Sequence, residues 1–99
     1  MTILASDSNI PSAIAVSVDA ETLRIELEDG RTIAIPTAWY PRLLYATQFE
    51  RDNWQLIGKG YGIHWEEIDE DISVESTLAG QPSGETQASF KKWLSSRNR

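Results

Sequence analysis

The chain of 99 residues contains no cysteine, only one histidine and no long apolar run. The absence of cysteine excludes disulfide bonds, thiolate nucleophiles and zinc sites that require sulfur. No apolar run approaches the roughly 18 residues that a membrane span requires, and the N-terminus does not resemble a signal peptide. We therefore expect a soluble cytoplasmic protein with no membrane contact. At this length it should form one domain with a modest core.

Acidic side chains outnumber basic ones, and the two kinds are unevenly distributed along the chain. Residues 1–80 hold 14 acidic and 5 basic side chains, whereas residues 81–99 hold 1 acidic and 4 basic. The summed field of a protein acts on whatever approaches it, so an acidic body repels nucleic acid and attracts basic partners. The basic tail could act in the opposite sense.

Alternating apolar residues predict three strands after a flexible N-terminal segment, residues 1–12. The predicted apolar faces are Ile14, Val16 and Val18, then Leu23, Ile25 and Leu27, then Ile33 and Ile35. Opposed residues of an antiparallel pair share a face, so a three-residue loop at residues 28–30 sets Ile25 opposite Ile33. A four-residue loop at residues 19–22 sets Val18 opposite Leu23. The sequence thus predicts an antiparallel meander with one apolar face.

Short helices are predicted to cover that face. Thr37 reads as the N-cap of a helix over residues 38–46, and Thr47 with Glu50 forms a capping box that begins a second helix ending near residue 54. Glycines at 58, 60 and 62 predict a turn, followed by a fourth strand near residues 61–65. The predicted fold class is α+β, with an antiparallel sheet (a three-strand meander plus a fourth strand), short helices and a C-terminal helix.

Residues 60–75 bring together the only histidine, a tryptophan and six carboxylates. Tyr61, Ile63 and Trp65 alternate, so we expect them to share the core face of the strand, with His64 on the other face, hydrogen-bonded locally. A further short helix is predicted over residues 73–79, with Asp71 or Ser73 as its N-cap.

Five carboxylates lie between those two elements. They are Glu66, Glu67, Asp69, Glu70 and Asp71. We interpret this acidic run as a solvated surface anchored by the buried side chains of Ile68 and Ile72. Its carboxylates repel one another, and a basic partner would relieve that repulsion.

Known chemistries do not fit this segment. The His64-x-Glu66 pair resembles part of a zinc deaminase site, but that site also needs cysteine ligands. The acidic run lacks the glycine and the final glutamate of a calcium loop, and residues 58–62 lack the spacing of a phosphate-binding loop. We predict no catalytic, metal-binding or cofactor-binding residues. A small enzyme that pairs His64 with a carboxylate, or with Ser73 or Ser76, remains the alternative.

A linker at residues 81–84 leads to a basic amphipathic tail, residues 85–99. Its helix over residues 85–96 carries Phe90, Trp93 and Leu94 on one stripe, with Lys91 and Lys92 beside them. Such a short helix is marginal alone, so it should dock on its own domain, on a second copy or on another protein. Docking through Phe90 and Trp93 is favoured over binding to nucleic acid, because four cations make few phosphate contacts.

Several motifs together resemble domain-of-unknown-function family 2442 over roughly residues 13–80. These are Asp29-Gly30-Arg31, Trp39-Tyr40-Pro41-Arg42-Leu43, Trp54-Gln55-Leu56-Ile57-Gly58, Gly60-Tyr61-Gly62-Ile63-His64-Trp65 and Asp69-Glu70-Asp71-Ile72-Ser73-Val74-Glu75. The resemblance implies a small α+β domain from bacteria or phage without an established catalytic activity. It also implies a gene context resembling a toxin–antitoxin pair, beside a small protein of domain-of-unknown-function family 4160.

These observations predict a non-catalytic protein-interaction module, the antitoxin-like component of such a pair, which binds a small basic partner protein. The residues predicted to contact the partner are Tyr61, His64, Glu66, Glu67, Asp69, Glu70, Asp71, Phe90, Lys91, Lys92 and Trp93. One alternative is a DNA-binding regulatory component that acts through the basic tail. Another is a domain with no partner, and a homo-oligomer formed through the C-terminal helix is a further arrangement.

Overall fold

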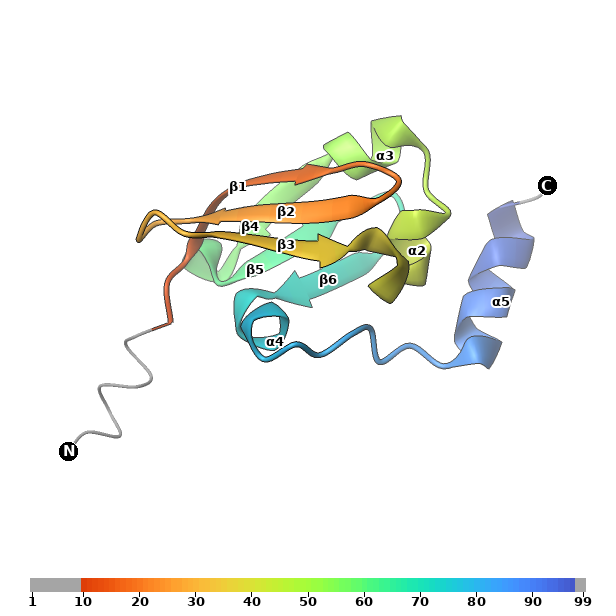
Figure 1. Ribbon diagram of the computed structural model, residues 1–99. Coiled ribbons are helices and arrows are strands. Elements are labelled where there is room, and N and C mark those ends of the chain that lie inside the picture. The colour runs from red at the N-terminus through yellow and green to blue at the C-terminus, as the bar shows by residue number, and fades with distance from the viewer. Residues whose placement is uncertain (1–9, 98–99) are drawn as a thin grey trace.

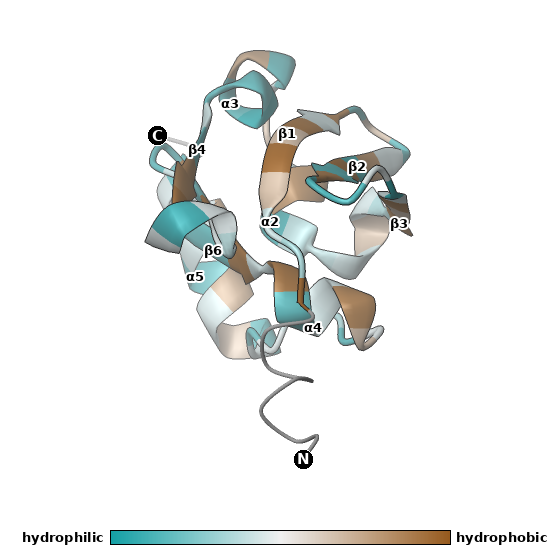
Figure 2. Cartoon of the chain, turned by 90° about the vertical axis from the view of Figure 1, so that its left-hand side faces the viewer, coloured by the Kyte–Doolittle hydropathy of each residue, from teal (hydrophilic) through white to brown (hydrophobic). Residues whose placement is uncertain are grey.

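The structure is a computed structural model that describes residues 10–97. Two three-stranded antiparallel sheets lie face to face as two layers, as the two perpendicular views show (Figures 1 and 2). The first sheet contains β1 (Ala13–Val18), β2 (Thr22–Leu27) and β3 (Thr32–Pro36), and the second contains β4 (Trp54–Ile57), β5 (Gly62–Trp65) and β6 (Glu70–Ser73). The predicted α+β class is confirmed, and the strand predicted near residues 61–65 is the centre of a second sheet.

Short helices connect and flank the two layers. They are η1 (Thr37–Trp39), α2 (Pro41–Leu44), α3 (Gln48–Asp52), η2 (Gly58–Gly60), α4 (Val74–Leu78) and α5 (Gln87–Arg97). The longest, α5, lies at one end of the layers, on the side of α2 (Figure 1). No helix within residues 10–97 has the length and apolar character that crossing a bilayer would require.

The meander has the predicted register in both of its hairpins. Ile25 lies opposite Ile33 across β2 and β3, and Val18 lies opposite Leu23 across β1 and β2. The side chains of Leu23 and Ile25 are fully buried. Hydrophobic residues recur along the strands of both layers (brown in Figure 2), and together they form one core cluster. The period of two and the loop lengths were therefore sufficient to set the register.

Ile14 is the exception, because it does not face the core as predicted. The register of β1 shifts between Ala13 and Ala15, so that Ala13 pairs with Leu27 and Ala15 with Glu26. This extra residue is a β-bulge, which reverses the facing of the side chains that precede it. Ala13 is consequently buried at 3% exposure, and Ile14 is 57% exposed.

The helix predicted over residues 38–46 is broken at Tyr40. Its backbone lies outside the helical region, at φ −126° and ψ 89°. A residue that precedes proline is disfavoured in the α conformation, and Pro41 therefore starts a new helix, α2. Thr37 is also not an N-cap: it lies within η1, is fully buried, and its hydroxyl donates to the Asp19 carbonyl at 2.9 Å.

The capping box at Thr47 is present as predicted. The Thr47 hydroxyl accepts from the Glu50 amide, and the Glu50 carboxylate accepts from the Thr47 amide. The helix that it begins, α3, ends at Asp52, because Trp54 already starts β4. The edge strands β4 and β6 were not predicted. β6 begins with Glu70 and Asp71, the last two carboxylates of the acidic run, whose residue types are unfavourable in a strand.

One buried polar connection joins α2 and α3 to the second sheet. The Trp65 indole N–H donates to the Arg51 carbonyl at 3.1 Å, and Trp65 is fully buried. The Arg51 guanidinium in turn donates to the carbonyls of Leu43 at 2.9 Å and Leu44 at 2.8 Å. Arg51 thus satisfies carbonyl groups at the end of α2 that have no partner within so short a helix.

The packed chain begins before residue 13. Residues 1–9 of the segment predicted to be flexible lie outside the described residues, whereas Ile10 packs against the core. The Ser12 amide donates to the Glu28 carboxylate at 3.2 Å, and the Ser12 carbonyl accepts from the Glu28 amide at 2.9 Å. Residues 10–12 are therefore part of the first layer.

The bulge can be tested with two matched substitutions in the first sheet. Ile25→Ala should lower the free energy of unfolding by about 3 kcal/mol, because it leaves a cavity in the core. Ile14→Ala should change it by less than about 0.5 kcal/mol, because the side chain is largely exposed. Urea unfolding of both variants measures the difference, and equal losses would contradict the bulge.

Candidate functional site

The acidic run forms the tip and outer strand of the β5–β6 hairpin. Its turn ends at Asp69, whose φ of +52° lies in the left-handed region that Asp tolerates better than most residues. Ile68 and Ile72 are buried at 1% and 3% exposure, as predicted, and hold the hairpin against the core. Glu66 and Glu67 are left exposed at the tip.

His64 lies on the outer face of the hairpin, held between two carboxylates. Its Nδ1 is 2.5 Å from Asp71 Oδ1, across the strand pair, and its Nε2 is 2.8 Å from Glu66 Oε1. These hydrogen bonds, first to Glu66 and then to Asp71, raise the pKa of the imidazole above its usual value. The prediction that His64 is hydrogen-bonded locally is confirmed, and protonated His64 offsets part of the charge of the acidic run.

The two serines considered as partners of His64 have a different role. The Ser73 hydroxyl accepts a hydrogen bond from the Ser76 amide at 3.0 Å and donates one to the Ser76 hydroxyl. Ser73 thus caps the N-terminus of α4. This is the cap predicted for the helix near residues 73–79.

Glu70 is separated from the rest of the acidic run. Neighbouring residues of a strand point to opposite faces, so Glu70 turns inward while Asp71 turns outward. Burial, and secondarily the charge of Glu85, raise the pKa of Glu70 to about 7, although Arg42 opposes this shift. Nearby Tyr40 is buried as well, and burial together with the charge of Glu70 raises its phenol pKa. Glu70 is thus a carboxyl group that changes charge near neutral pH.

Arg42 is the central cation beside Glu70. Its guanidinium pairs with the Glu85 carboxylate at 2.6 Å and donates to the Ile68 carbonyl at 2.8 Å. Both side chains of this ion pair are largely buried, and the pairing lowers the pKa of Glu85. Sequence reasoning missed this role. The only available signal was that Arg42 lies in a motif with two aromatic residues.

The chain between α4 and α5, residues 80–86, is here named the strap. Its Gln81 amide donates to the Ser76 carbonyl at 2.9 Å, and its Ser83 amide donates to the Trp39 carbonyl at 3.0 Å. The Tyr40 hydroxyl donates to the Gln81 carbonyl at 3.2 Å. The predicted linker is therefore fixed to the domain at several points.

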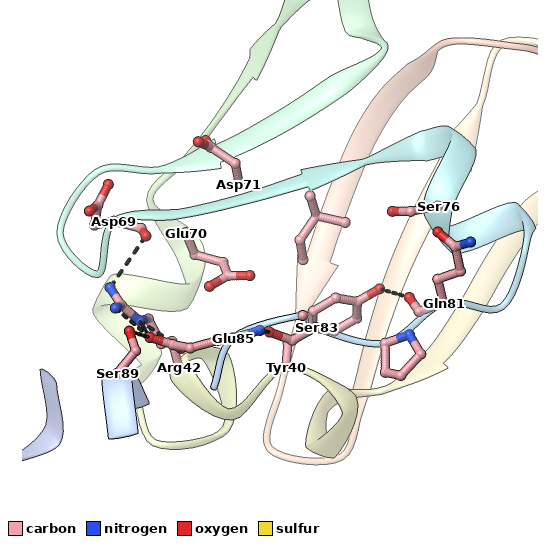
Figure 3. Close-up of a pocket in the computed structure, with 13 residues that line it drawn as sticks. Tyr40, Arg42, Asp69, Glu70, Asp71, Ser76, Gln81, Ser83, Glu85 and Ser89 are labelled. Atoms are coloured by element: carbon pink, nitrogen blue, oxygen red, sulfur yellow. Dashed lines mark hydrogen bonds and ion pairs between the residues drawn. The ribbon is translucent and has the colours of Figure 1, made fainter. Parts of the chain in front are cut away.

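A cavity of about 600 Å³ lies between β6 and the strap (Figure 3). Residues 69–72 line it on one side and residues 81–85 on the other, with Tyr40 and Arg42 completing its wall. The Glu70 carboxylate points from β6 into this space. The cavity and its acidic lining were not predicted, because they depend on where the strap docks.

The C-terminal helix α5 packs on its own domain, one of the three arrangements considered. The Phe90 ring lies 5.3 Å from the Tyr45 ring, and the Trp93 ring lies beneath the guanidinium of Arg97 at 4.6 Å. Arg97 also pairs with Glu50 at 2.8 Å. Aromatic rings and an arginine therefore dock the helix.

Lys91 and Lys92, predicted to lie beside the apolar stripe of the helix, do not take part in that docking. Both are exposed, and neither forms an ion pair within the described part of the chain. Lys92 does share a shallow groove with Glu67 and Asp69. The two lysines remain available on the surface.

Tyr61 was predicted to face the core and to belong with the acidic run, and the structure corrects the first expectation. Its backbone is helical, at φ −87° and ψ −7°, because it ends η2 and does not belong to β5. The alternation of β5 therefore does not extend to it, and Tyr61 is 45% exposed. It lies at the opposite end of β5 from Glu66, so the predicted contact residues do not form one patch.

Comparison with known protein families assigns the chain to one of them. The model of a family described as protein of unknown function (DUF2442) matches residues 13–83. The chain belongs to this family. The match covers both sheets and ends within the strap, so the earlier resemblance is confirmed. No curated protein matches the chain.

Two solved structures resemble the DUF2442 chain. A protein of unknown function from Rhodospirillum rubrum is 31% identical, with a TM-score of 0.68 over 83% of this chain and 99% of that one. An uncharacterized protein from Chromobacterium violaceum is 16% identical, with a TM-score of 0.65 over 98% of this chain and 92% of that one. The second likeness concerns the fold alone.

The burial of Glu70 predicts a pH-dependent stability difference. In the unfolded chain Glu70 ionises near pH 4.5, whereas in the folded chain it ionises near pH 7, so ionisation between these values destabilises the fold. Glu70→Gln should match the wild type near pH 4 and exceed its free energy of unfolding by about 2 kcal/mol at pH 8. Urea unfolding across this range measures the effect. The exposed control Glu26→Gln should show no such trend.

The carboxylates around His64 predict its titration. The imidazole pKa of the wild type, measured by NMR, should lie above 6.5. Glu66→Gln and Asp71→Asn should each lower it, because each removes a negative hydrogen-bond acceptor. An unchanged pKa in both variants would contradict the arrangement of the three side chains.

Proposed function

We propose that this DUF2442 chain is a non-catalytic interaction module whose acidic hairpin binds a basic partner protein. The observation that carries the proposal is the exposure of carboxylates on the hairpin that form no ion pair with a lysine or arginine within residues 10–97. Within residues 10–97, the ion pairs formed by arginine involve Asp29, Glu50 and Glu85, none of which lies in the acidic run. Among the described residues, His64 alone forms ion pairs with the run.

A basic partner would gain from this arrangement in two ways. Opposite charges speed the encounter of two proteins, and the partner's cations would relieve the repulsion between Glu66, Glu67 and Asp69. The hairpin is also held firmly, because Ile68 and Ile72 are buried beneath it. A preorganised surface loses little conformational freedom when a partner binds.

The proposed partner is the product of the adjacent gene, and the proposed role is that of the antitoxin-like member of the pair. This part of the proposal rests on the resemblance to the family, which implies a neighbouring gene for a small protein of family 4160 in an arrangement resembling a toxin–antitoxin pair. The alternative of DNA binding through the tail has less support. Arg97, one of the tail's cations, is engaged by Glu50 in the structure.

The proposal is tested by co-expressing the chain with its adjacent gene product and purifying the tagged chain. We expect a complex that weakens with added salt and that Glu66→Lys/Glu67→Lys reduces at least about tenfold in affinity. The matched control Glu21→Lys/Glu26→Lys makes the same change in net charge on exposed residues of the β1–β2 hairpin. Equal effects of both variants, or no complex in the wild type, would refute the proposal.

A further inference from the structure

Within the described residues 10–97, the strand β6 has one edge without a strand partner. It is the outermost strand of its sheet, and its other edge pairs with β5. The Val74 amide donates to the Tyr61 carbonyl at 3.0 Å, so this opposed pair is hydrogen-bonded. Hydrogen-bonded and non-bonded pairs alternate along an antiparallel ladder, which makes His64 and Asp71 a non-bonded pair. The backbone amide and carbonyl of Asp71 therefore point away from β5.

That outer edge faces the cavity between β6 and the strap (Figure 3). Across residues 10–97 no backbone hydrogen bond joins β6 to the strap, and the strap amides of Gln81 and Ser83 donate to the carbonyls of Ser76 and Trp39 instead. Asp69 and the first three residues of β6 line one side of the cavity, and five consecutive residues of the strap line the other. The cavity thus has the form of a slot that runs along a strand edge.

The size of the slot suits an extended chain segment. A strand rises about 3.3 Å per residue, lies about 4.8 Å from its neighbour and occupies a layer about 10 Å thick. A segment of about four residues therefore fills roughly 600 Å³, which matches both the cavity volume and the length of β6. Strand addition of this kind is a common mode of peptide recognition.

Charge decides between the candidate occupants. The Glu70 carboxylate points into the slot and Asp69 and Glu85 also line it, whereas the Asp71 carboxylate is turned outward to His64. Arg42, the one cation among the described lining residues, is already paired with Glu85. A second copy of β6 would bring Glu70 and Asp71 against identical carboxylates, which disfavours self-pairing of the edge. A basic segment would meet opposite charge instead.

We propose that the slot takes an extended basic segment of the partner protein, which adds to β6 as a further strand and places a lysine or arginine against Glu70. This rests on the proposed function and goes further, since it names the chemistry and conformation of the bound segment. The Asp71 amide and carbonyl provide the backbone contacts. Glu70 provides the charge that selects the side chain.

Asp71→Pro tests the backbone contact directly. Proline removes the amide that faces the slot while leaving the β5–β6 hydrogen bonds intact, and it is tolerated at such edge positions. The matched control Asp71→Ala also loses the carboxylate but keeps the amide. With the full chain and an alternating lysine–valine peptide of about eight residues as probe, we expect Asp71→Pro to bind about tenfold more weakly than Asp71→Ala.

Two further peptides distinguish strand addition from non-specific electrostatic attraction between a basic peptide and the acidic protein. A lysine–proline peptide carries the same charge but lacks backbone donors, and it should bind at least about tenfold more weakly than the lysine–valine peptide. A glutamate–valine peptide should not bind. NMR should place the largest amide shifts of the lysine–valine complex on residues 69–73 and on the strap. Equal affinity for the two lysine peptides, or amide shifts confined to Glu66 and Glu67, would overturn the proposal that the slot binds the peptide as an added strand.

The pH dependence of binding gives an independent readout. Affinity for the lysine–valine peptide should rise between about pH 6 and pH 8 as Glu70 ionises, and Glu70→Gln should flatten the rise. The groups that face Glu70 are Arg42 from α2, Glu85 from the strap, Tyr40, and Asp69 and Asp71 of its own hairpin. The pKa of His64 on the outer face is raised as well, so His64→Gln is included as a control. If the affinity of Glu70→Gln rose by the same amount over this pH range, Glu70 would not contribute to binding of the peptide.

The failure of the slot and the failure of the proposed function give different results. If the co-expressed complex is lost in Glu66→Lys/Glu67→Lys but unchanged in Asp71→Pro, the interaction stands and the slot is refuted. If no complex forms at all, the proposed function fails. A dimer of the chain alone, with amide shifts centred on β6, would show that a second copy occupies the slot and would also refute the proposal.

Discussion

The burial of Trp65 is the constraint on which the rest of the structure depends. The side chain lies between the two sheets with no exposed surface, and its indole N–H must find an acceptor there. That acceptor is the Arg51 carbonyl, and Arg51 in turn holds the carbonyl end of α2. Since α2 also carries Arg42, the position of the cation beside the slot is fixed through this buried connection.

The acidic run performs two different tasks because it is partly a strand. Alternation along β6 sends Asp71 outward to His64 and Glu70 inward to the slot, so two adjacent carboxylates have different surroundings. The outer group lies among exposed charges of the hairpin. The inner group lies in a confined space where its charge depends on pH. The carboxylates of the acidic run therefore differ in exposure and in their response to pH, although they are adjacent in the sequence.

How much could be predicted from the sequence depended on the range of the interactions. The register of the meander followed from local alternation and loop length, and the cap at Thr47 from residues three apart. Ile14 and Tyr61 were misplaced because a bulge and a helical turn interrupt the alternation. The partners of Arg42 and Arg51 are set by tertiary packing, and no local pattern indicates them. The slot likewise depends on tertiary packing and is not indicated by any local sequence pattern.

Arg42 concentrates several connections in one side chain. It joins Glu85 of the strap, the Ile68 carbonyl of the hairpin and, at 5.2 Å, the ring of Trp93 in α5. Groups that share a partner do not contribute additively to stability. Changes at Arg42, Glu85 and Trp93 are therefore epistatic. Once one of the three side chains is replaced, replacing a second should lower the stability by less than it would in the wild type. Substitutions at these three positions are therefore expected to occur together during evolution.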